Sequence, residues 1–225
     1  MATSSAGRRN QNGGRRAKAL VLAAIAITYA SNYWPSPQVR DAVLLRYHLA
    51  SYERWGVLVP HLFLYTTITA ALSAIFWFGF ARAGWLPHPP LDNFRRSIGP
   101  GLIGGVLALI VSVATAFIFF PPGMVHWIAP DPWKITGNVF SNFYEEFVWR
   151  GFLLFGLRRL IGFWPAAFVS AASWAILHIQ YPLAGQLLIL VVGIGFGWLV
   201  KKTNSLWTPY LAHEVLDILG DSLIG

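Results

Sequence analysis

Long apolar segments recur along the whole chain and are separated by short polar or proline-containing connections such as "WPSP", "LPHPP" and "FPPG". Most approach the length of about 17–25 residues that an α-helix needs to cross a bilayer. They are Ala17–Tyr33, Gly56–Phe80, Ile98–Phe120, Ile135–Leu157, Trp164–Gln180, Gly185–Val200 and Leu206–Ile224. The pattern predicts an all-α, polytopic membrane helix bundle of about seven transmembrane helices.

Composition strengthens the membrane interpretation. The 225 residues are 56% hydrophobic and only 12% charged, whereas soluble domains carry about 25% charged residues. The chain contains no cysteine, which excludes disulfides, iron–sulfur clusters and thiol catalysis.

The formal net charge of +8 is concentrated at the amino terminus and in short connections. This distribution is typical of topology signals and of contacts with the lipid bilayer, not of a nucleic-acid partner. We expect residues 1–16 to be a basic, disordered cytoplasmic tail, and residues 17–134 to hold amino-terminal transmembrane helices with an amphipathic loop near Arg40–Arg54. The first segment also resembles a signal peptide, but the chain stays apolar after it, so we expect an uncleaved span.

Ionisable residues inside the apolar segments cluster in the carboxyl-terminal half. They are Glu145, Glu146, Arg150, His178, His213, Glu214, Asp217 and Asp221. Each charged side chain costs about 2.5–3.5 kcal/mol at the centre of a membrane helix, so such residues are candidates for function.

Helical spacing separates the two adjacent glutamates. Glu146 and Arg150 are four residues apart and can pair on one helix face. Glu145 lies about 100° further round the helix, so its carboxylate is free to face another helix. The alternative is that all three form a structural salt-bridge cluster.

The histidines belong to the same predicted site. His213 and Asp217 are four residues apart and share a face, and Trp174 lies one turn before His178 in "SAASWAILH". With a rise of about 1.5 Å per residue, these residues and Glu145 reach overlapping depths in three helices.

Two chemistries suit this set of side chains. Glu145, His178 and His213 could bind zinc with an open position for water. Alternatively, Glu145 and His178 activate water directly while His213 and Asp217 hold an oxyanion. The short zinc motif with two histidines around a glutamate is absent, and both chemistries remain open at this point.

Three motifs resemble one known family. "EEFVWRG" (Glu145–Gly151), "WAILH" (Trp174–His178) and "HEVLD" (His213–Asp217) are similar, in order and spacing, to the motifs of the CAAX protease and bacteriocin-processing intramembrane peptidases, also called the CPBP or Abi family. Trp174 departs from the usual phenylalanine, and Asp217 replaces the more frequent asparagine.

The resemblance implies an endopeptidase with its catalytic core in the last four segments, over residues 135–225. Glu145 and His178 would then activate water, and His213 and Asp217 would stabilise the oxyanion. Glu146, Arg150 and Trp174 would support them. Expected substrates are membrane-bound peptides or lipidated proteins, such as prenylated CAAX carboxyl termini or precursor leaders, and the expected location is a bacterial plasma membrane with the amino terminus in the cytoplasm.

Two other functions use buried charges. A proton-coupled transporter would have internal repeats, and the sequence has no visible repeat and places these charges in one half. A non-catalytic membrane scaffold would tolerate the loss of Glu145, whereas all the motif residues are present here.

Overall fold

The computed structural model describes residues 93–178 and 181–224, together with isolated helical positions at Ala19, Leu22, Ala23, Ala26 and Ala71. The expected basic tail and the amphipathic loop near Arg40–Arg54 lie outside the described residues. So do the first two expected spans, apart from those isolated positions.

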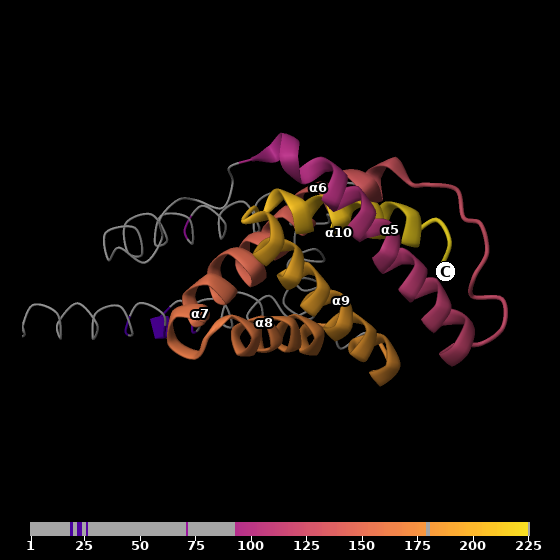
Figure 1. Cartoon of the computed structure of the whole chain (residues 1–225). Helices are drawn as coiled ribbons and strands as arrows, with labels where there is room; N and C mark the ends of the chain where they lie inside the picture. The colour runs from indigo at the N-terminus through magenta and orange to yellow at the C-terminus, as the bar shows by residue number, and fades with distance from the viewer. Residues whose placement is uncertain are drawn as a thin grey trace, which may run out of the picture.

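The continuous part is all-helical, as predicted (Figure 1). Its elements are α5 (Phe94–Phe119), α6 (Pro132–Glu146), the π-helix η4 (Phe147–Leu154), α7 (Phe155–Ile161), α8 (Phe163–Leu177), α9 (Leu183–Thr203) and α10 (Trp207–Gly220). Helix α10 packs against both α5 and α6, and α8 packs against α9. An isolated backbone bridge joins Val125 to Ile224.

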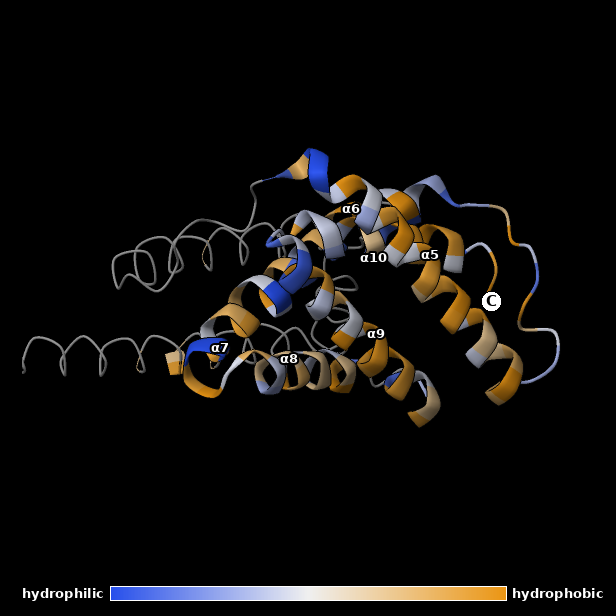
Figure 2. Cartoon of the chain, viewed as in Figure 1, coloured by the Kyte–Doolittle hydropathy of each residue, from blue (hydrophilic) through white to orange (hydrophobic). Residues whose placement is uncertain are grey.

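Two of the described helices, α5 and α9, are long and apolar enough to cross a membrane. Their apolar surfaces are visible in Figure 2. These helices correspond to the third and sixth expected spans, and they indicate an integral membrane protein. Helices α8 and α10 have 15 and 14 residues, fewer than a full crossing needs, so the expected seven spans are not all present as long helices.

The fourth expected span is divided into three helical elements. Helix α6 begins at Pro132, after Asp131, whose side chain accepts a hydrogen bond from the Trp133 amide at 2.9 Å. After Glu146 the backbone changes to a π-helix, a conformation that occurs often at functional sites. The fourth expected span, Ile135–Leu157, is therefore helical throughout, but it contains a π-helical section that the sequence did not predict.

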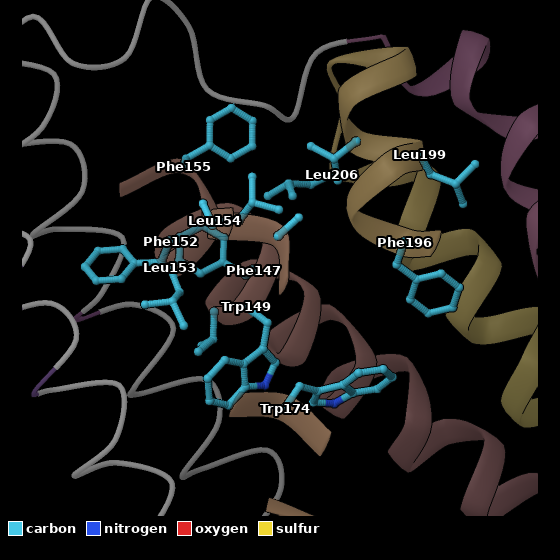
Figure 3. Packing of buried hydrophobic residues seen from close by; sticks show 14 of the residues in the cluster. Phe147, Trp149, Phe152, Leu153, Leu154, Phe155, Trp174, Phe196, Leu199 and Leu206 are labelled. Carbon is cyan, nitrogen blue, oxygen red and sulfur yellow. The ribbon is translucent and has the colours of Figure 1, made fainter. Parts of the chain in front are cut away.

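The hydrophobic core surrounds η4, in which all eight residues are buried. Figure 3 shows core residues from η4 together with Trp174 of α8 and Phe196 of α9. Phe152, Trp149 and Val148 are at most 1% exposed. Within residues 93–178 and 181–224, this fully buried segment directly follows the two glutamates.

Helix α5 packs on α10 through a stripe of small residues. The buried residues of α5 are Ser97, Gly101, Gly105, Ala108, Ser112 and Ala116. A Cβ atom at position 105 would lie 2.5 Å from Val215 Cβ and 2.7 Å from the Ala212 carbonyl oxygen. Small residues allow such close backbone approach between membrane helices, and this contact holds the helix that carries His213.

We expect Gly105→Ala to lower the free energy of unfolding by about 1–3 kcal/mol, because the new methyl group overlaps α10. The matched control is Gly195→Ala in α9, where an added Cβ meets no atom within 4 Å. Denaturant unfolding of the full-length protein in detergent micelles measures both. Equal stabilities of the two variants would contradict this packing.

Candidate active site

A buried ion pair lies at the centre of the site. Arg150 Nη1 is 2.9 Å from Glu146 Oε1, and both side chains are 1% exposed. The pair predicted from the four-residue spacing is therefore present. The same carboxylate oxygen is 3.0 Å from His213 Nδ1, so Glu146 also connects the end of α6 to α10.

Aromatic rings enclose the remainder of the Arg150 guanidinium. Its carbon atom lies 4.1 Å from the Trp174 ring centroid and 5.3 Å from that of Phe196. Its Nε and Nη2 atoms have no hydrogen-bond partner among the described residues, so these cation–π contacts are part of what stabilises the buried charge.

Helix α9 approaches helix α8 and the Arg150 guanidinium closely because residue 193 is glycine. A Cβ there would lie 2.9 Å from Ala171 Cβ and 3.1 Å from Arg150 Nη2. Neither Gly193 nor Phe196 was identified from the sequence, since both sit in an apolar segment without a distinguishing pattern.

Trp174 contacts both predicted water-activating residues. Its Nε1 donates a hydrogen bond of 2.6 Å to Glu145 Oε2, and its backbone carbonyl accepts one of 2.8 Å from His178 Nδ1. Its ring also meets the His213 ring edge-on, with centroids 5.2 Å apart. Glu145 therefore faces Trp174 while Glu146 faces Arg150, in agreement with the different directions expected from the helical spacing.

His178 lies just beyond the end of α8, at its C-cap, and not inside the helix as expected. A carbonyl oxygen can only accept a hydrogen bond, so Nδ1 carries the proton that it donates to Trp174. In the neutral ring Nε2 then holds a lone pair. The Tyr181 ring stacks on His178 at 6.2 Å between centroids, which steadies the histidine outside the helix.

His213 and Asp217 share a face of α10, as predicted. His213 Nε2 is 3.7 Å from Asp217 Oδ2. His213 is buried, whereas the Asp217 side chain is 29% exposed. His213 thus lies between two carboxylates, Glu146 at Nδ1 and Asp217 near Nε2.

The proposed zinc ligands do not form a metal-binding group in this arrangement. Within residues 93–178 and 181–224, no three histidine, cysteine or acidic side chains are placed to hold a metal ion. Glu145 is bonded to Trp174, and His213 uses Nδ1 to contact Glu146. In this arrangement the three residues therefore do not fit zinc.

Comparison with known protein families gives a match over the carboxyl-terminal part of the chain. A family model described as type II CAAX prenyl endopeptidase, Rce1-like, matches residues 131–219. The match extends from the N-cap of α6 almost to the end of α10 and includes every site residue described above. No curated protein and no solved structure matches the chain.

We expect Arg150→Met to lower the free energy of unfolding by about 3–5 kcal/mol, because it leaves the Glu146 carboxylate buried without its cation. Adding Glu146→Gln should restore part of the loss. The control is Arg158→Met, since Arg158 stacks on Phe155 at 3.9 Å and forms no ion pair with a described residue. If denaturant unfolding gives Arg150→Met and Arg158→Met the same free energy of unfolding, the buried pair does not stabilise the fold by the expected amount.

Proposed function

We propose that the chain, whose residues 131–219 match the model of the type II CAAX prenyl endopeptidase Rce1-like family, is an intramembrane endopeptidase that hydrolyses a peptide bond of a membrane-associated substrate. The observation that best supports this function is the position of Trp174, which contacts Glu145, His178 and His213. Through these contacts Trp174 would hold the proposed general base, the proposed second water-binding group and the histidine proposed to bind the oxyanion close to one another.

Glu145 and His178 would activate the attacking water. One oxygen of Glu145 is occupied by the Trp174 indole, which leaves Oε1 to accept a proton from water. The Nε2 lone pair of His178 would accept the other hydrogen of the same water and orient its oxygen. Both side chains are half-buried, in contrast to buried Glu146 and Arg150.

His213 and Asp217 would stabilise the negative charge that develops on the carbonyl oxygen. A His213 that donates from Nδ1 to Glu146 can also donate from Nε2 only when it is doubly protonated. Carboxylates near both ring nitrogens favour that cation. Asp217 donates only in its protonated form, so we assign the main oxyanion contact to His213 and the orientation of its ring to Asp217.

The bond changes follow from these assignments. The water oxygen attacks the carbonyl carbon while its proton moves to Glu145. The carbon–nitrogen bond then breaks as Glu145 gives that proton to the leaving amine. The first products are a new carboxylic acid and a free amine, and the remaining proton of the water then passes from the acid to the amine to give a carboxylate and an ammonium group. Glu145 returns to its starting state.

We infer that the substrate is a prenylated CAAX carboxyl terminus or a precursor leader, held at the bilayer. We place the carboxyl-terminal ends of α7 and α9 in the cytoplasm, because basic residues gather on the cytoplasmic side of membrane proteins. The membrane would be a bacterial plasma membrane, with the amino terminus of the chain also in the cytoplasm. The two helix ends carry Arg158, Arg159, Lys201 and Lys202. Lys201 lies 4.6 Å from the Trp164 ring centroid, a pairing suited to a membrane interface.

We expect Glu145→Gln to lower the cleavage rate by about 10²–10⁴-fold, because the amide cannot accept the proton of water. The matched control, Asp131→Asn, makes the same carboxylate-to-amide change at the exposed N-cap of α6, outside both the site and its surroundings, and should retain the rate because asparagine also caps helices. Cleavage of membrane-presented peptides by the full-length protein in lipid nanodiscs measures both, with a chelator present and absent. Equal losses in both variants, or a loss upon chelation that zinc restores, would contradict the mechanism.

A further inference from the structure

A polar seam runs between α6 and α10 beyond the site. It consists of Lys134, Asn138, Asn142, Glu214, Asp217 and Asp221. Lys134 Nζ is 2.8 Å from Asp221 Oδ1, and Asn138 Nδ2 donates to Asp221 Oδ2 at 3.2 Å. One turn further along α6, Asn142 lies beside Glu214 and Asp217 of α10.

The seam is continuous with the active site at one end and exposed at the other. The three seam residues of α6 are spaced four apart, and the next residue in that series is Glu146, which contacts His213. At the far end the side chains of Lys134 and Asp221 are 57% and 35% exposed. Asn142 and Glu214, between these ends, are only 2% and 8% exposed.

The buried part of the seam contains polar atoms without partners. Asn142 Nδ2 and both carboxylate oxygens of Glu214 form no hydrogen bond of good geometry with the described residues, although Asn142 and Tyr210 lie close to the Glu214 carboxylate, and Glu146 Oε2 at the site has none either. Each such atom costs about 1–3 kcal/mol if it stays unsatisfied. Native proteins satisfy buried polar groups with protein partners or with ordered water.

Apolar side chains at these positions would cost a membrane helix bundle less free energy than the buried polar side chains of the seam. Polar residues at membrane depth are usually retained where they form a path for water, ions or protons. Hydrolysis at Glu145 consumes one water molecule per bond, and the apolar surfaces of α5 and α9 offer water no hydrogen-bonding route.

We propose that the polar seam binds ordered water and delivers it from the Lys134–Asp221 end to Glu145. Asn142 and Glu214 supply the donor and acceptors that bridge its buried part. The use of this water as the reactant rests on the proposed peptidase function, whereas the hydration of the seam does not.

Thiol labelling tests the hydration without any assay of cleavage. The chain has no cysteine, so Asn142→Cys introduces a single thiol in the full-length protein. In lipid nanodiscs, silver ions should protect this thiol from later alkylation by a maleimide under denaturing conditions, because silver reaches thiols through water. Asn138→Cys, nearer the exposed end, should be protected faster.

The control is Leu107→Cys on the apolar face of α5. Leu107 is 57% exposed. If the exposed fraction of the side chain alone set the rate, silver would protect position 107 faster than position 142. The proposal predicts the reverse order, because position 107 faces an apolar surface and position 142 lies in the polar seam. Protection at 107 but at neither seam position would overturn the proposal.

Kinetics test the delivery of water. Asn142→Leu should lower kcat by about tenfold with little change in KM, since it removes one bridging contact from the water path. Asn142→Ser keeps a hydrogen-bonding group and should retain most of the rate. Equal rates for the two variants would overturn delivery through the seam. Silver protection without any cleavage by the wild type would instead contradict the peptidase function and leave the hydrated seam in place.

Discussion

The buried ion pair between Glu146 and Arg150 is the interaction on which the rest of the structure depends. A buried charge that loses its partner destabilises a protein by several kcal/mol, so the surrounding helices must supply compensating contacts. His213 of α10 shares the Glu146 oxygen, while Trp174 of α8 and Phe196 of α9 enclose the guanidinium. The pair thereby determines where three other helices meet the junction of α6 and η4.

This arrangement divides the polar residues of the site into a buried set and a half-buried set, and the proposed reaction uses groups from both. Glu146, Arg150 and His213 are buried, whereas Glu145, His178 and Asp217 are half-buried. Trp174 connects the two groups, because its ring covers Arg150 while its indole nitrogen and backbone carbonyl hold Glu145 and His178. A phenylalanine at this position would keep the stacking contact but would lack the donor to Glu145. The tryptophan thus gives this chain an additional means of orienting its proposed general base.

The sequence predicted the contacts within a helix in more detail than the contacts between helices. The pairs Glu146–Arg150 and His213–Asp217 follow from the four-residue spacing within a helix, and the helical fold follows from the apolar segments. The π-helix after Glu146 and the end of α8 before His178 depend on packing between helices, which periodicity does not encode. Gly105, Gly193 and Asn142 were missed for the same reason: their roles depend on which residue of a distant segment faces them.

Isotope labelling under single-turnover conditions tests most directly the claim that Glu145 acts as a base toward water. An excess of the full-length protein in lipid nanodiscs would cleave a membrane-anchored peptide in water labelled with heavy oxygen. Mass spectrometry would then examine the product and the digested fragment that contains Glu145. The account predicts heavy oxygen in the new carboxylate of the product and none in the Glu145 side chain. Heavy oxygen in Glu145 would show that the carboxylate attacks the peptide bond itself, which contradicts the account.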